Sequence, residues 1–218
     1  MTRAEENYLK AIFHLEESSK GAIATNTIAR QMKTKPSSVT DMVKRLSDKD
    51  LLTYTPYKGV SLSSKGTVLA LKVIRKHRLW ETFLVEKLDF MWDEVHEIAE
   101  QLEHIHSEKL IERLDAFLGH PQLDPHGDPI PGPKGEIHNE PKTSLAEIPI
   151  ASTGICIGVR DSSASFLNFL NRNKVALGDR ITVLDREEFD GSLQIKVRNK
   201  QLRISQEIAA NLYIRTYE

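Results

Sequence analysis

Four side chains of the types that bind divalent metals fall on one predicted helix. They are His96, Glu100, Glu103 and His104. At about 100° per residue, their offsets place all four on the same side of that helix. A charged cluster that faces another helix is costly unless a cation compensates it. The spacing therefore favours a divalent-metal site over an exposed acidic face that carries histidines by chance.

A second pair of such side chains precedes this helix. His77 and Glu81 are four residues apart on a long predicted helix, so they share one face and can join the first group if the helices pack antiparallel. A lone pair of this kind would favour an exposed face, but six candidates on two adjacent helices favour metal. The other histidines have no partner at helical spacing or lie in a segment without periodicity, where we interpret them as incidental: His14, His106, His120, His126 and His138.

Basic and acidic residues are segregated along the chain, although the net charge of the 218 residues is only −1. From Thr25 to Trp80 there are twelve basic residues and three acidic ones. From Glu81 to Leu118 there are eleven acidic residues and three basic ones. The first segment favours a polyanionic partner such as nucleic acid, and the second favours a cation.

The basic segment predicts a winged helix-turn-helix. Apolar periodicity predicts helices over residues 4–17, over 25–32 with Thr25 as the cap, and from Pro36, which suits the first position of a helix. The run LLTYTPYKGVSLSSKG then predicts two short strands around a Pro-Tyr-Lys-Gly turn. In this motif the third helix enters the major groove of DNA.

Small polar side chains and lysines cover the outer face of the third predicted helix and its surroundings. Short hydroxyls let a helix approach base edges, and lysines at the helix start and the wing tip reach phosphates. Helix capping or ordinary surface exposure also explains each residue alone, so only the combined arrangement carries the prediction. The predicted DNA contacts are Lys35, Pro36, Ser37, Ser38, Thr40, Lys44 and Lys58.

The rest of the chain predicts a helical middle, a linker and a small β-barrel. Helices are predicted over about 65–88, 93–106 and 107–118, and six of the nine prolines follow in one stretch without periodicity. Short β-type runs beyond residue 148, with one helix near 163–171, suit a small barrel. The predicted fold class is mainly α, with domains at residues 1–63, 64–120, 121–148 and 149–218.

The composition and motifs of the chain bear on its cellular location and on whether it is an enzyme. No apolar run approaches the roughly 20 residues of a membrane span, and the charged N-terminus is unlike a cleavable signal. Cys156 is the only cysteine, so no internal disulfide can form, and its apolar neighbours predict a buried side chain. The chain lacks an HExxH motif and a nucleophile beside the candidate ligands, which argues against a metalloenzyme. We therefore expect a cytoplasmic protein that is not an enzyme.

Six segments resemble the family of the diphtheria toxin repressor and the manganese transport regulator: EENYLKAIFHLEE, PSSVTDMVKRL, KGVSLSSKG, RKHRLWETFL, VHEIAEQLEHIHSE and HPQLDPHGDPIP. The resemblance covers nearly the whole chain and is to the long form with a C-terminal SH3-like or FeoA-like barrel. It implies a homodimer whose helical domain provides dimerisation and metal binding. It also implies a primary site at Asn7, Glu100, Glu103 and His104, and an ancillary site at His77, Glu81 and His96, which the barrel would complete with Asp161 or Ser165.

The resemblance also bears on the metal. Iron-type members have a sulfur ligand where this chain has Glu100, and Asn7 likewise offers oxygen. Oxygen-rich sites suit harder ions, so Mn2+ is favoured over Fe2+. The short manganese regulators have an acid where Lys10 stands, so their closely paired metal arrangement is not expected in this chain.

The predicted function is a metal-dependent transcriptional repressor of metal-uptake genes. Divalent metal acts as the co-repressor by orienting the winged helices of a homodimer on a palindromic operator. The alternative is a metal-independent winged-helix regulator whose barrel senses another ligand. A chelator distinguishes the two, because it would leave DNA binding intact in the alternative.

Overall fold

The computed structural model of the chain describes residues 1–19, 21–55, 58–137 and 142–216. The chain forms two compact units, each built from several segments. The first contains Met1–Trp80, Glu100–Asp115 and Ile130–Ile137. The second contains Glu81–Ala99, Ala116–Pro129 and His138–Glu218.

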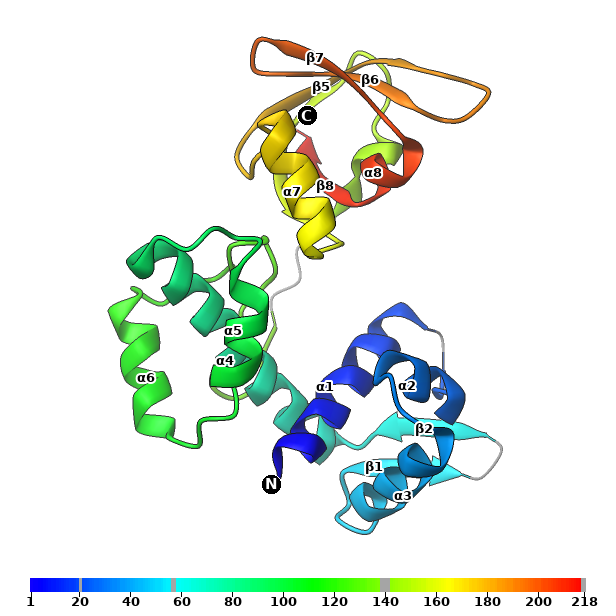
Figure 1. Cartoon of the computed structure of the whole chain (residues 1–218), viewed down its shortest axis with the longest axis vertical. Coiled ribbons are helices and arrows are strands. Elements are labelled where there is room, and N and C mark those ends of the chain that lie inside the picture. Colours follow the sequence, from blue (N-terminus) through cyan, green and yellow to red (C-terminus); the bar gives the residue numbers. More distant parts are fainter. Residues whose placement is uncertain (20, 56–57, 138–141, 217–218) are drawn as a thin grey trace. The chain divides into compact units, whose positions relative to one another are not determined.

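The first unit begins with a winged helix-turn-helix (Figure 1). Its elements are α1 (Arg3–Ser18), α2 (Thr25–Gln31), α3 (Pro36–Ser47), β1 (Leu52–Thr55) and β2 (Gly59–Leu62), and β1 pairs antiparallel with β2. Apolar residues at helical spacing form its core, among them Leu9, Ile12, Ile28, Val43 and Leu46. This confirms the motif predicted from periodicity.

The predicted start of α3 is confirmed, whereas the predicted cap of α2 is wrong. Pro36 begins α3, as predicted. Thr25 was predicted to cap α2, but Ala24 is the cap residue and makes no side-chain cap hydrogen bond, so Thr25 is instead the first helical residue. The predicted wing turn includes Pro56 and Tyr57, which lie outside the described residues.

Three helices follow the wing. They are α4 (Ser64–Leu88), α5 (Val95–Leu102) and α6 (Glu108–Phe117). Helix α5 is shorter than predicted, because the amide of Ile105 bonds to the carbonyl of Leu102 and Ser107 opens α6. Glu103 and His104 therefore lie in the turn after α5, and the prediction that one helix carries all four candidate ligands was wrong.

A buried ion pair joins α4 to α6 within the first unit. Arg75 lies 2.9 Å from the Asp115 carboxylate, and both residues are only 8% exposed. The Arg75 guanidinium also donates to the carbonyl oxygen of Pro131 at 2.6 Å. This residue therefore fixes part of the proline-rich segment as well as α6.

The second unit contains a six-stranded antiparallel sheet in the order β3-β8-β4-β5-β6-β7. Together with its helices α7 (Ala164–Asn173) and α8 (Gln206–Ala210), we call it the β-domain (Figure 1). Its strands are β3 (Thr143–Ser144), β4 (Thr153–Val159), β5 (Arg180–Arg186), β6 (Leu193–Val197), β7 (Lys200–Ile204) and β8 (Leu212–Thr216).

The β-domain confirms the predicted change from helices to short strands. Strands β3 and β8 were not among the predicted runs, although β8 pairs with both β3 and β4. Cys156 is 1% exposed in the core of this domain, and burial raises the pKa of its thiol to about 11. Among the described residues, no helix combines the length and apolar character needed to cross a membrane.

We expect Asp115→Ala to lower the free energy of unfolding by about 3 kcal/mol, because it leaves the buried guanidinium of Arg75 without its carboxylate. Urea denaturation followed by circular dichroism would measure the loss. Glu112→Ala is the matched control, since Glu112 is an exposed carboxylate on the same helix. Equal stability of the two variants would contradict the assignment.

Candidate metal centre

The first cluster of candidate ligands surrounds Glu103, whose side chain is fully buried. Nζ of Lys10 lies 2.8 Å from both carboxylate oxygens, and Nδ1 of His77 lies 2.6 Å from Oε2. Burial alone would raise the pKa of Glu103, but the hydrogen bond from His77 and the charge of Lys10 lower the pKa below its usual value. The carboxylate is therefore ionised and electron-rich at neutral pH.

His104 follows in the same turn. Its Nδ1 contacts the carboxylate of Glu6, a buried residue of α1. A carboxylate can only accept, so Nδ1 carries the proton and Nε2 keeps its lone pair. Nε2 lies 3.6 Å from Oε1 of Glu103. A carboxylate that fixes a histidine in this way is the usual support for a metal-binding imidazole.

Two buried acceptors are unsatisfied on the elements that form this cluster, one on α1 and one in the turn after α5. Among the described residues, neither Oδ1 of Asn7 nor Nε2 of His104 has a hydrogen-bond partner. An unmade hydrogen bond at a buried polar atom costs about 1–3 kcal/mol. A cation held beside Glu103 would satisfy the imidazole nitrogen of His104, and the amide oxygen of Asn7 is a further buried donor on α1. The donor set of one imidazole nitrogen and several oxygens suits a divalent metal of intermediate or hard character.

The remaining members of this cluster are Glu100 and His77. Glu100 pairs with the ammonium group of Lys10, which also contacts Glu103. The structure thus gathers Glu100, Glu103 and His104 with the Lys10 side of α1. His77, which the sequence assigned to the ancillary site, contacts Glu103 through Nδ1, and its ancillary role stays a prediction.

A second cluster lies in the second unit around Glu81, which is 2% exposed. The carboxylate lies 3.4 Å from Nδ1 of His96 and 3.5 Å from Nδ1 of His126. Glu81, Asp124 and His126 each offer a ligand atom, and these atoms all lie within 4.8 Å of one another. This trio has the donor types and the spacing of a metal site.

Sequence reasoning missed Asp124 and His126. Both lie in a proline-rich segment without periodicity, yet both are buried. Oδ1 of Asp124 accepts from the amides of His126 and Asp128, which forms a tight turn. Only the resemblance of HPQLDPHGDPIP to a known family marked this segment in the sequence.

Asp161 lies two residues after Val159, the β4 residue whose amide donates to the carbonyl of His126. Its Oδ1 accepts from the amide of Ser163, the cap residue of α7. Among the described residues, no group of closely spaced ligand atoms includes Asp161. Its predicted role at the ancillary site stays a prediction.

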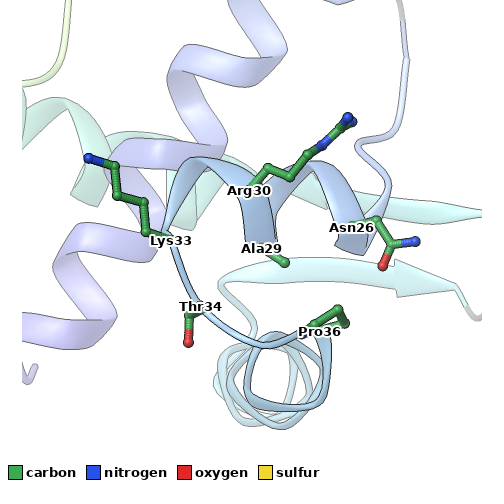
Figure 2. Close-up of a pocket in the computed structure, with 6 residues that line it drawn as sticks. All are labelled: Asn26, Ala29, Arg30, Lys33, Thr34 and Pro36. Carbon is green, nitrogen blue, oxygen red and sulfur yellow. The ribbon is translucent and has the colours of Figure 1, made fainter.

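The candidate DNA-reading surface is the start of α3. Most of the predicted contacts are exposed, and Thr40 is half-buried, with its hydroxyl donating to the carbonyl of Pro36. No side chain caps α3, so its first amides remain available. A hollow beside Pro36 is lined by residues of α2 and of the turn after it, and Arg30 of α2 and Lys33 of the turn extend in different directions (Figure 2). The exposed predicted residues are Lys35, Pro36, Ser37, Ser38, Lys44 and Lys58.

Fold and side chains together define a winged helix-turn-helix protein with buried clusters of side chains that could hold a metal ion. Domain models agree with this class. The N-terminal DNA binding domain of iron dependent repressors matches residues 1–60, their metal binding and dimerisation domain matches residues 63–132, and the FeoA domain matches residues 143–216. The chain belongs to the iron-dependent repressor family.

Individual relatives are consistent with this family. The iron-dependent repressor IdeR of Mycobacterium leprae is 34% identical over 154 residues, which is 67% of this chain and 66% of that protein. The diphtheria toxin repressor of Corynebacterium jeikeium is 32% identical over 143 residues, which is 66% of this chain and 59% of that protein. The chain thus matches slightly less than two thirds of these curated relatives.

Solved structures match over the whole chain. A manganese-dependent transcriptional repressor in complex with manganese has a TM-score of 0.88 at 32% identity and covers 98% of this chain and 100% of its own. The manganese regulator SloR has a TM-score of 0.79 at 34% identity and covers 100% of both chains. ScaR with bound Cd2+ has a TM-score of 0.81 at 34% identity and covers 98% of this chain and 99% of its own.

The second cluster generates a pH prediction for the metal-free protein. Burial disfavours the charged ring of His126, but the hydrogen bond and charge of Glu81 outweigh burial and raise the pKa to about 9 from its usual 6.5. A raised folded-state pKa stabilises the fold fully below pH 6.5, and this stabilisation is lost as pH rises through 9. We expect a loss of up to about 3 kcal/mol across this window.

Urea denaturation of chelator-treated protein at several pH values would measure this loss. His126→Gln should flatten the dependence between pH 6.5 and 9. His14→Gln is the control, because His14 is an exposed histidine of α1. A variant at His126 with the full wild-type pH dependence would show that another group is responsible.

Proposed function

We propose that this protein is a metal-dependent, DNA-binding transcriptional repressor and that a divalent cation is its co-repressor. The observation that carries the proposal is the buried, unsatisfied Nε2 of His104 beside the ionised carboxylate of Glu103, with a second buried, unsatisfied acceptor on Asn7. One acceptor belongs to α1 of the winged helix-turn-helix and the other to the turn after α5. A shared ion would therefore join these two elements.

We assign the residues to two ion sites. Asn7, Glu100, Glu103 and His104 would hold the first ion, and Glu81, His96, Asp124 and His126 would hold the second. Oxygen donors dominate the first set, which favours Mn2+ over Fe2+. The manganese named for related solved structures agrees with this preference.

The chain's own residues explain how occupancy would control DNA binding. Leu9 and Ile12 of α1 are fully buried in the core that also contains Val39 and Val43 of α3. Because these helices pack together, fixing α1 also fixes α3 and the wing. Bound metal would favour the arrangement of α1 in which the ligands converge, because the ion binds that arrangement more tightly than the others.

We further propose that the protein acts as a homodimer on a palindromic operator. In the second unit, Leu88, Met91 and Phe117 are exposed by 51%, 53% and 64%. Apolar side chains exposed around the ends of α4 and α6 suit burial against a second copy. Two winged helices related by a two-fold axis would then read successive major-groove half-sites. The repressor would act in the cytoplasm, and the genes that it regulates would be those of metal uptake.

We expect Glu103→Gln to abolish most of the Mn2+-dependent gain in operator affinity, because it removes the central negative charge of the first site. Mn2+ titrations of operator binding by fluorescence anisotropy would measure the gain. Glu112→Ala, at an exposed carboxylate of α6, is the control. An undiminished metal response in the Glu103 variant would refute the proposal, and DNA binding that survives chelation in the wild type would favour a metal-independent regulator.

We expect Lys44→Ala to weaken DNA binding about equally on all sequences, because its ammonium would contact phosphate rather than bases. The slope of log affinity against log salt should fall by about 1. Lys200→Ala on strand β7 is the matched control, since it removes an exposed lysine of the β-domain. An unchanged slope would remove Lys44 from the DNA contacts.

A further inference from the structure

The turn that carries His126 is attached to the β-domain. The amide of Val159 in β4 donates to the carbonyl of His126 at 3.0 Å. Gly127 follows with φ of +82°, and a Cβ there would lie 2.1 Å from the carbonyl oxygen of Ile157. Nζ of Lys142 donates to the carbonyl of Gly127 at 2.8 Å. The turn is therefore in close backbone contact with β4, and a side chain at position 127 would separate them.

The imidazole of His126 is held on its other side by Trp92, which lies between α4 and α5. The two rings are stacked, with centroids 6.1 Å apart and planes 14° from parallel. Nε2 of His126 lies 2.9 Å from the carbonyl oxygen of Trp92. A carbonyl can only accept, so Nε2 donates, and the lone pair of the neutral ring is on Nδ1, which faces Glu81.

Trp92 is held in turn by α7 of the β-domain. Its indole N–H donates to Oδ1 of Asn171 at 2.7 Å, and Nδ2 of Asn171 donates to Asp93 at 3.1 Å. The ring also packs against the β-domain core. One asparagine thus fixes two consecutive residues before α5. The chain of contacts runs from Asn171 through Trp92 to His126 and ends at Glu81.

We propose that the β-domain is a positioning element for the second ion site: Asn171, acting through Trp92, holds His126 with Nδ1 directed at Glu81. This inference rests on the proposed function, because it takes Glu81, Asp124 and His126 as ligands. Asn171 is a positioning residue and touches no ion itself. Since linkage is reciprocal, ion binding at Glu81 also stabilises the contacts that attach the His126 turn to β4.

Mn2+ titration of the full-length, metal-free protein tests the inference, with free Mn2+ followed by its electron paramagnetic resonance signal. Asn171→Ala should weaken one of two binding steps by about tenfold or more and leave the other unchanged, as expected for a residue that supports a ligand. His126→Ala identifies the affected step by eliminating it. Asn168→Ala is the matched control, because Asn168 is an exposed asparagine of α7.

Trp92→Phe separates the hydrogen bond from the ring contact, because phenylalanine keeps an aromatic ring over His126 but cannot donate to Asn171. It should weaken the same step as Asn171→Ala, and the double variant should be no weaker than either single one. Hydrogen exchange gives a second readout. Mn2+ should slow exchange of the Val159 amide in the wild type and leave it unchanged in His126→Ala.

The outcomes separate this inference from the proposed function. Wild-type affinity at both steps in Asn171→Ala, together with a lost step in His126→Ala, overturns the positioning role alone. Two intact steps in His126→Ala overturn the second ion site and the inference with it. Loss of both steps in Asn171→Ala also overturns the inference. The inference predicts that the first ion site binds Mn2+ unchanged, and this unchanged step also shows that the variant is folded.

Discussion

The buried negative charge of Glu103 is the constraint on which the first site depends. A carboxylate without solvent is stable only when cations or donors surround it. Lys10 and His77 provide this compensation from α1 and α4. These contacts join the N-terminal helix to the turn after α5, and each of the two elements carries a buried acceptor that no described residue satisfies, on Asn7 and on His104.

Local sequence patterns predicted most helices of the first unit and most of the candidate ligands of its site. The apolar spacing of α1, α2 and α3 is short-range information, as is the proline that begins α3. Glu100, Glu103 and His104 were found by assuming a helix longer than α5. They come together nonetheless, because the turn after α5 keeps Glu103 and His104 beside the side chains of α1.

The second site could not be predicted in the same way. Asp124 and His126 lie in a turn whose conformation depends on distant partners, namely Val159 and Trp92. No periodicity in the sequence encodes contacts between residues more than 30 positions apart. Strand β8 of the β-domain is a second example. It pairs with β3 and β4, which are distant in the sequence, and the local pattern did not predict it as a strand.

The salt bridge between Lys10 and the two glutamates has a consequence for the ion-free protein. Because the ammonium is part of α1, the two salt bridges join this helix to α5 and the turn after it by charge. Folding therefore already restricts the side chains of Glu100 and Glu103, so that ion binding costs less of their conformational entropy. An incoming ion therefore competes with the Lys10 ammonium for the two carboxylates, and its binding replaces this salt bridge with a metal link to α1.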